Sequence, residues 1–161
     1  MPQRNIPLGV VFDCNLCLRS IIAPYGLAAA CFDLLGTEAV TVFVSRDILA
    51  EVKETLSRPS LQQKFPELTH ESTERILERL RASGILIYNV PETFRYPRDP
   101  DDEIYINLAL VTNADFLVTY DTDLLDLMGE SAIGQDFQHR FPELQIVEPM
   151  EFLDAVRGSF N

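Results

Sequence analysis

Acidic residues sit beside several strongly apolar segments of this chain, and their placement predicts a site for a divalent cation. Asp13 closes the apolar run PLGVVFD, and Asp121 and Asp123 follow the run ADFLVTY. Asp102 lies in the sequence DPDD just before INLALV, and Glu51 lies in the segment that follows TVFV. In an α/β protein the carboxyl ends of parallel strands gather along one edge, so these acids can meet in space. Carboxylates that share a cleft repel one another, and a divalent metal ion is the expected counter-charge.

The charge of the chain is unevenly distributed. Its net charge is −12, and the segment from Asp99 to Asp136 contains ten acids but no Lys or Arg. A solvated acidic face is the ordinary explanation of such a segment. Broad, nonspecific DNA binding is unfavourable for this composition, because neutralising phosphates requires a basic surface. A nucleic-acid substrate would therefore have to be held by local Arg and Lys side chains or by metal.

The elements that must position these acids are those of a single α/β/α domain over residues 1–161. We expect strands at residues 8–12, 41–44, 85–88, 116–119 and 145–147. We expect helices at residues 26–35, 45–57, 69–82, 99–112, 123–128 and 149–157, and a loop at residues 129–142. Strands that alternate with helices indicate a doubly wound parallel sheet with helices on both faces.

The composition is typical of a soluble globular protein. No apolar stretch approaches the roughly 20 residues that cross a bilayer, and the N-terminal sequence MPQRNIPLGVVFD is a poor signal peptide. Cys14, Cys17 and Cys31 are too few for a disulfide framework and indicate free thiols in a reducing compartment. Cys14 and Cys17 form a CxxC sequence, which is a weak signal for a redox pair or a zinc site. We therefore expect a cytoplasmic protein.

Each acid also has an ordinary structural explanation. Asp13 favours a turn or a cap, and Asp123 is a candidate cap for the short helix that follows it, which makes Asp121 the stronger site residue. Glu51 could be an ordinary exposed residue of its helix. It lies, however, at the border of the apolar stripe, whereas Glu54 lies further round toward solvent. A border position suits a carboxylate that reaches into a cleft at the sheet edge.

The DPDD sequence has a strong alternative explanation. Asp99 followed by Pro100 is a favourable helix start, with Asp99 as the cap. Asp101 and Asp102 would then be acids of the first turn that interact with the helix dipole. Spacing alone does not decide which of these two faces the site, and we favour Asp102.

Four segments resemble, in order, the motifs of PIN-domain ribonucleases. VVFDCN resembles the opening hhhDTN, and VSRDILAEVKETLSRP resembles the second motif, in which a Ser or Thr begins a helix that carries a Glu. RDPDDEIYINLALVTNADFLVTYDTDLLDL resembles the DPDD helix, strand and TxDxDLL segment of the family. EPMEFL resembles the last strand-to-helix turn of the bacterial subgroup described as toxins of toxin–antitoxin pairs. The resemblance covers residues 8–156 and implies a PIN-like three-layer α/β/α fold with a parallel five-stranded sheet.

The resemblance also implies a Mg²⁺- or Mn²⁺-dependent endoribonuclease. The catalytic and metal-binding acids that it implies are Asp13, Glu51, Asp102 and Asp121. Asp123 is a further metal-binding position, and Asn15 and Thr119 are supporting positions. The departure from the family pattern is Cys14, where the family usually has Thr, and it could weaken a hydrogen bond beside a metal ligand without removing a ligand.

The chemistry and partners implied follow from these residues. Hard cations prefer oxygen ligands, and Mg²⁺ keeps several waters, one of which can act as the nucleophile. Arg19, Arg46 and Lys53 are candidate RNA-backbone contacts, although each is also an ordinary surface charge. A small antitoxin protein would cover the acidic cleft with a basic side chain. We also expect a homodimer or higher homo-oligomer, with contacts near Phe65 or Phe94 unless those residues belong to the core.

Two other families with an Asp after the first strand fit the sequence less well. A haloacid-dehalogenase-like phosphatase needs a second acid two residues later, where this chain has Asn15, and a later Lys to balance charge. A response-receiver domain also needs a Lys near its last strands, but the last Lys of the chain is Lys64. A non-catalytic PIN-like module that binds RNA or a protein partner stays open as the alternative to the nuclease.

Overall fold

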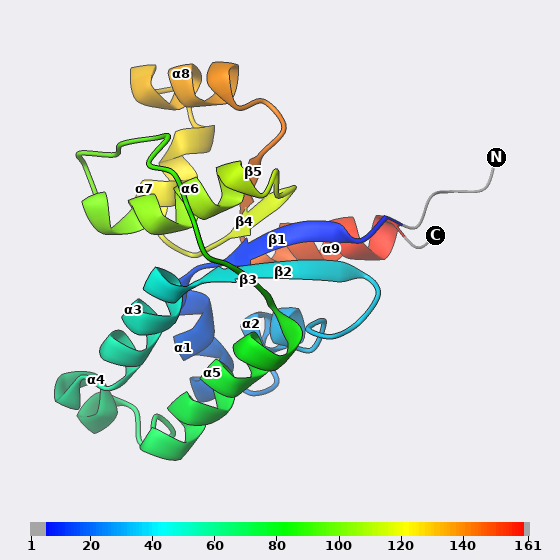
Figure 1. The fold of residues 1–161 in the computed structure, drawn as a ribbon. Coiled ribbons are helices and arrows are strands. Elements are labelled where there is room, and N and C mark those ends of the chain that lie inside the picture. The colour runs from blue at the N-terminus through cyan, green and yellow to red at the C-terminus, as the bar shows by residue number, and fades with distance from the viewer. Residues whose placement is uncertain (1–5, 160–161) are drawn as a thin grey trace.

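Five parallel strands form one sheet, in the order β3-β2-β1-β4-β5, in the computed structural model, which describes residues 6–159 (Figure 1). The strands are β1 (Leu8–Phe12), β2 (Val40–Ser45), β3 (Ile85–Ile87), β4 (Phe116–Val118) and β5 (Gln145–Val147). The predicted α/β fold with a parallel five-stranded sheet is confirmed. The domain was expected over residues 1–161, and both of its ends lie outside the described residues. The first residues of the segment judged a poor signal peptide also lie outside them.

Helices cover both faces of the sheet. They are α1 (Cys14–Ile22), α2 (Leu27–Phe32), α3 (Arg46–Leu56), α4 (Pro59–Lys64), α5 (His70–Ser83), α6 (Glu103–Val111), α7 (Thr122–Leu125), α8 (Ala132–Arg140) and α9 (Pro149–Ser159), with the 3₁₀ turns η1 (Pro100–Asp102) and η2 (Asp126–Met128). α6 packs against β1, β2 and β4, whereas α5 contacts β2 and α9 contacts β4. Figure 1 shows α6, α7 and α8 on one side of β1 and β2, with α1, α2, α3 and α5 on the other. Within residues 6–159, every helix is too short or too polar to cross a bilayer.

The central strands are buried on both faces, which explains why they read as continuous apolar runs. Val10 and Val11 of β1 and Leu117 of β4 are completely buried. Phe94 also belongs to this core and is only 3% exposed, which agrees with the core alternative that the sequence left open for it. Phe65 is half-buried and packs against the same core.

Local hydrogen bonds fix the helix starts that the sequence predicted. The Ser45 hydroxyl accepts the Ile48 N–H at 3.2 Å and caps α3. Thr69 and Ser72 form a capping box at the start of α5, in which each side chain accepts the other's backbone N–H. Side-chain acceptors of this kind satisfy N–H groups that the first helical turn leaves unpaired.

The predicted loop at residues 129–142 was wrong, because it contains α8. Ser131 caps this helix by accepting the Gly134 N–H at 3.1 Å. The Gln138 side chain donates to the carbonyl oxygens of Leu127, Gly129 and Gly134, which fixes the helix to the chain before it. Phe137 is its only large, fully buried side chain within the described residues, so the helix carries almost no apolar periodicity. Helices α1 and α4 were also not predicted. In α4 no residue is buried, so this helix likewise has no apolar periodicity to reveal it.

The strand order reverses between β1 and β4, and binding sites of open parallel sheets form at such a point. β1 pairs with β2 on one side and with β4 on the other. The Asp13 N–H donates to the Val118 carbonyl oxygen at 3.1 Å, so the chain leaving β1 is joined to the end of β4. Two of the acid-bearing segments, which are distant in sequence, therefore begin side by side.

The turn between α5 and β3 generates a stability prediction. A Cβ atom on Gly84 would lie 2.5 Å from the Leu80 carbonyl oxygen, which itself accepts the Gly84 N–H. We expect Gly84→Ala to destabilise the protein by about 1–3 kcal/mol, because backbone would have to move. Gly158→Ala is the control, since a Cβ there meets nothing within 4 Å. Equal unfolding free energies of the two variants in urea denaturation would contradict this steric explanation.

Candidate metal centre

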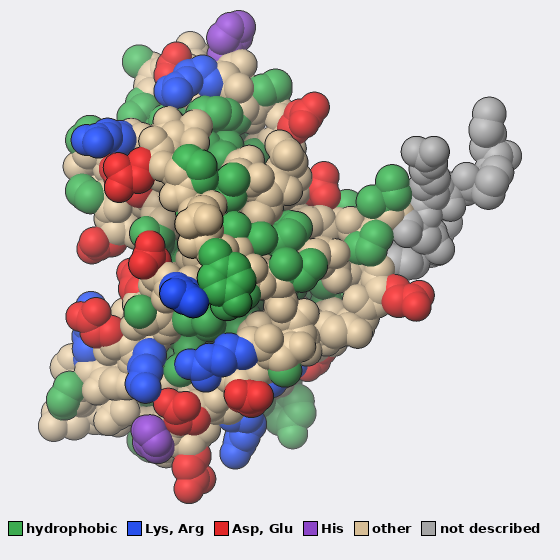
Figure 2. Space-filling view, in the orientation of Figure 1, with side chains coloured by type: hydrophobic (Ala, Val, Ile, Leu, Met, Phe, Trp, Pro, Cys, Tyr) green, Lys and Arg blue, Asp and Glu red, His purple; other side chains and the backbone are tan. Residues whose placement is uncertain are grey.

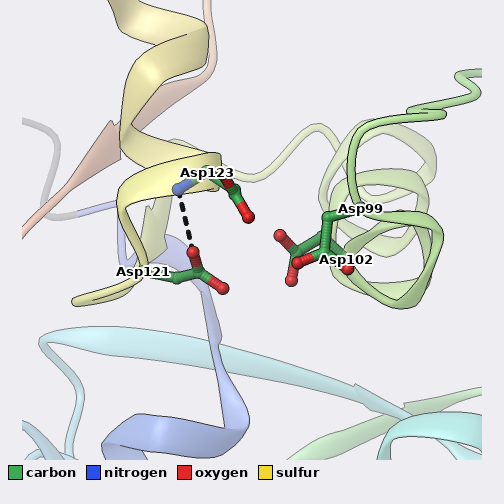
Figure 3. Close-up of side chains that lie close together, drawn as sticks. All are labelled: Asp99, Asp102, Asp121 and Asp123. Carbon is green, nitrogen blue, oxygen red and sulfur yellow. Dashed lines mark hydrogen bonds between the residues drawn. The ribbon is translucent and has the colours of Figure 1, made fainter.

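Four aspartates from two separate turns bring their carboxylates together at the carboxyl edge of the sheet. They are Asp99, Asp102, Asp121 and Asp123, and their nearest oxygen atoms all lie within 4.8 Å of one another. Asp99 and Asp102 belong to η1 and the residue before it, and Asp121 and Asp123 belong to the start of α7. Figure 3 shows the two pairs facing each other across a gap into which their oxygens point.

Asp13 joins this cluster through Thr119. The Thr119 hydroxyl donates to Asp13 Oδ2 at 2.7 Å and accepts the Asp121 N–H at 2.8 Å. The other carboxylate oxygen of Asp13 accepts the Cys14 N–H at 2.6 Å. Thr119 is completely buried, so this single hydroxyl fixes the ends of β1 and β4 relative to each other. The position that the resemblance marks as supporting thus contacts two of the expected acids.

Burial and repulsion act on the two most deeply buried acids. The pKa of Asp13 is raised to about 6, mainly by burial and also by the charges of Asp121 and Glu51, against the hydrogen bonds from Thr119 and Cys14. Burial likewise raises the pKa of Asp102 to about 8, with contributions from the charges of Asp121, Asp99 and Asp13. Such shifts mean that the ionised cluster is unfavourable in the absence of a counter-ion.

Glu51 approaches the cluster from α3. Its side chain is half-buried, as its border position on the helix predicted, and Glu54 is exposed. Burial raises the pKa of Glu51, the nearby Tyr105 hydroxyl lowers it, and the charge of Asp101 raises it. Glu51 is close enough to raise the pKa of Asp13, although it is not one of the four acids whose oxygens lie within 4.8 Å.

Asp99 is the site residue that the sequence argument assigned to a different role. Asp99 occupies the N-cap position of η1, as the sequence predicted, but its side chain makes no capping hydrogen bond among the described residues. Burial and the charges of Asp121 and Asp123 raise the pKa of its carboxyl group. The missed signal is the spacing of three between Asp99 and Asp102, which places two side chains on the same side of a helical turn.

The choice between the two central acids of DPDD is clear in the structure. Asp102 is 5% exposed and faces the cluster, whereas Asp101 is exposed. Asp123 lies in the cluster, and the alternative that it caps the short helix was wrong. The cap of α7 is Asp121, whose side chain accepts the Asp123 N–H at 2.8 Å (Figure 3). Asp121 is therefore both the N-cap of α7 and a member of the cluster.

One cation borders the cluster. Arg98 forms ion pairs with Asp123 and Asp126, each at 2.7 Å. The pair with Asp123 engages one of its oxygens and leaves the second oxygen free of this contact. Arg98 directly precedes Asp99, so one segment supplies both an acid of the cluster and the cation that pairs with Asp123.

Buried polar side chains anchor the segment that carries Arg98 and Asp99. The Asn107 side chain accepts the N–H groups of Thr93 and Phe94 and donates to the Phe94 carbonyl oxygen. The Tyr96 hydroxyl donates to the Asp123 carbonyl oxygen at 2.7 Å, which ties this segment to the start of α7. Because Asn107 belongs to α6, both halves of the cluster are fixed to the layer that covers the sheet.

The remaining supporting positions lie at the edge of the site. Asn15 is exposed in the first turn of α1 and makes no hydrogen bond to an acid of the described chain. Cys14, Cys17 and Cys31 are buried, free thiols, and burial raises the pKa of Cys14 to about 12. Thiols with a raised pKa are poor redox groups and poor zinc ligands, so the CxxC sequence is structural.

The candidate RNA contacts lie near the carboxyl edge but are not equivalent. The Arg19 guanidinium lies 4.3 Å from the centre of the Tyr120 ring, and that of Arg46 lies 5.0 Å from the centre of the Tyr88 ring. Lys53 forms a long ion pair with Glu74, at 4.0 Å on the surface. Figure 2 shows an acidic notch at the left edge of the molecule, with Lys and Arg side chains below it over α3 and α5.

The donor set fits a hard divalent cation. All of the candidate ligands are carboxylate oxygens, which Mg²⁺ and Mn²⁺ prefer. Oδ2 of Asp102 and Oε2 of Glu51 are buried without a hydrogen-bond partner in residues 6–159. Buried anionic oxygens without a partner are costly, and a cation between them would remove that cost.

Comparisons with known proteins agree with this architecture. A family model described as a PIN domain matches residues 9–123, which include every acid of the cluster. The crystal structure of VapBC2 from Rickettsia felis, bound to a DNA fragment from their promoter, is similar over 88% of this chain and 98% of that chain. The TM-score is 0.53 and the sequence identity is 18%, so this likeness shows the fold alone. A comparison with curated proteins gave no match.

The raised pKa values predict that the metal-free protein loses stability as the pH rises. With folded-state pKa values of about 6 for Asp13 and about 8 for Asp102, the folded state binds more protons than the unfolded state from about pH 4 to about pH 8. The stability from these acids is therefore present at low pH and is lost as the pH rises through those values. A loss of about 2 kcal/mol lowers the melting temperature by about 4–8 °C.

Thermal unfolding in EDTA between about pH 5.5 and about pH 8.5 measures this loss. Asp102→Asn mimics the neutral acid and should flatten the profile, whereas Asp154→Asn, an exposed position on α9, should leave it unchanged. A profile of Asp102→Asn as steep as that of the wild type would show that the pH dependence arises elsewhere.

Proposed function

Because the chain belongs to the PIN-domain family, we propose that it is a Mg²⁺- or Mn²⁺-dependent endoribonuclease that hydrolyses RNA phosphodiester bonds. Enzymes of this family are generally nucleases that use divalent metal. The observation that carries the proposal is the set of four converging carboxylates, in which a buried oxygen of Asp102 has no partner in the described chain. A buried oxygen of Glu51, outside this set, likewise has none. The family resemblance read from the four sequence motifs is confirmed by the family match over residues 9–123.

The acids divide between holding the metal and orienting water. Asp13, Asp102 and Asp121 are the proposed ligands, directly or through water, and Asp99 and Asp123 complete the set. When bound, Mg²⁺ or Mn²⁺ would supply an activated water and stabilise charge on the phosphate oxygens. Thr119 keeps two of these ligands in place through its two hydrogen bonds, so little rearrangement would accompany binding.

Glu51 is the proposed general base. Its raised pKa brings it closer to the range in which a carboxylate accepts a proton near neutral pH. The buried Oε2, which has no hydrogen-bond partner within residues 6–159, is free to orient the attacking water. Asp13 is less suited to this role, because the Cys14 N–H and the Thr119 hydroxyl already occupy both of its oxygens.

We further propose that the chain is the toxin component of a toxin–antitoxin pair. The fold likeness to VapBC2 and the EPMEFL segment support this assignment. An antitoxin would be a small protein that places a basic side chain over the acidic notch, where Arg98 already pairs with Asp123. A cytoplasmic location, a single domain over residues 1–161 and a homo-oligomeric state belong to the same proposal.

The proposal predicts metal-dependent cleavage of RNA. With Mn²⁺, wild-type protein should cleave a single-stranded RNA. Asp13→Asn should lower the rate by about 100-fold, because it removes a ligand of the metal ion that would stabilise charge on the reacting phosphate. Gel electrophoresis of an end-labelled RNA measures the rate, and EDTA should abolish it.

Asp154→Asn is the matched control, because it removes a carboxylate from the surface of α9 and should leave the rate unchanged. Equal rates for wild type and Asp13→Asn would reject the assigned site. RNA binding without cleavage under every metal condition would favour the non-catalytic PIN-like module instead.

A further inference from the structure

A groove lies at the carboxyl ends of β2 and β3, beside the candidate metal centre. It has a volume of about 450 Å³ and is lined by Ser45, Arg46, Asp47, Ile87, Tyr88, Asn89, Val90 and Pro91. This volume is within the range of about 300–1,000 Å³ that is usual for small-ligand sites. A smaller hollow shares four of these residues and extends to Pro100 and Glu103, which flank Asp102 in the chain. The hollow therefore borders η1 and α6, the segments on either side of Asp102, although none of the four clustered acids lines it.

An aromatic side chain and a cation form one wall of the groove. Tyr88 is 66% exposed, directly after β3, so it contributes little to the core. The Arg46 guanidinium lies 5.0 Å from the centre of its ring, in cation–π contact. Exposed aromatic rings next to Arg are the usual stacking platforms for unpaired nucleotides. Figure 2 shows a large hydrophobic side chain with adjoining basic side chains on this face, near the acidic notch.

We propose that this groove binds an unpaired nucleotide of single-stranded RNA next to the phosphate that is cleaved. The base stacks on the face of the Tyr88 ring that Arg46 leaves open, and Arg46 contacts the adjoining phosphate. The inference rests on the proposed ribonuclease function, since the groove lies at the same carboxyl edge of the sheet as the acids.

The other charges along the groove favour a base over a phosphate. Asp47 lines the groove, and Glu92 and Glu103 line the hollow that continues it. Carboxylates repel phosphate, but they accept hydrogen bonds from the amino and imino groups of bases. Those groups are available on an unpaired base and are occupied in a duplex. The arrangement therefore selects single strands, with Arg46 as the one cation among the described residues that line the groove.

Binding of RNA to Asp13→Asn protein tests the proposal without interference from cleavage. The probe is a fluorescent single-stranded RNA of mixed sequence, measured by anisotropy with Mg²⁺ present. Adding Tyr88→Ala should weaken binding by about tenfold, whereas Tyr88→Trp should preserve it, because stacking is sequence-tolerant but needs a ring. Arg46→Ala should also weaken binding, and more strongly at low salt.

Tyr25→Ala is the matched control, since Tyr25 is a fully exposed tyrosine that does not line the groove. This variant should bind RNA as tightly as the parent protein does. Equal affinity of the Tyr88→Ala and Tyr25→Ala proteins for RNA, with unchanged melting temperatures, would overturn the proposal that the groove binds a nucleotide. RNA cleavage by wild type at a rate unaffected by Tyr88→Ala also overturns it but leaves the ribonuclease function standing. Binding that depends on Tyr88 in a protein that cleaves no RNA supports the groove and rejects the ribonuclease.

Discussion

Repulsion among carboxylates is the constraint on which this site depends. Asp102 is buried against three other acids, and burial with their charges raises its pKa to about 8. Such a cluster cannot hold itself together, so its geometry has to come from the rest of the fold. The strand order supplies the first part, because β1 and β4 are neighbours and end at the same edge. The favourable free energy of burying the apolar core then offsets the unfavourable repulsion among the carboxylates.

Neutral hydrogen-bonding groups, more than ion pairs, give the acids their positions. Thr119 connects Asp13 with the backbone of Asp121, and Asn107 holds the segment that leads to Asp99. A hydroxyl or an amide orients a carboxylate while adding no charge that would compete with a metal for it. Arg98 is the exception, and it engages Asp123 at the more exposed side of the cluster.

The sequence predicts most of the sheet because its strands are short, apolar and buried on both faces. Asp13 and Asp121 could be placed at one edge from that pattern alone, and helix geometry separated Glu51 from Glu54. Asp99 could not be assigned to the site from the sequence, because an Asp before Pro at a helix start has the same sequence signature whether or not its side chain caps the helix. α8 escaped prediction since only Phe137 marks its buried side, and its anchoring by Gln138 is a tertiary contact without a local pattern. The contacts of Asn107 and Tyr96 likewise depend on segments that only the folded chain brings together.

The connection between β3 and η1 has Tyr88 at one end and Asp99 at the other. Asn107 and Tyr96 hold this connection in place before anything binds. A nucleotide at the Tyr88 end and a metal ion at the Asp99 end would therefore meet one preformed segment, and neither ligand would have to order it for the other. Coupling between the two ligands would then have to come from the charges of the metal and the phosphate rather than from order in the chain.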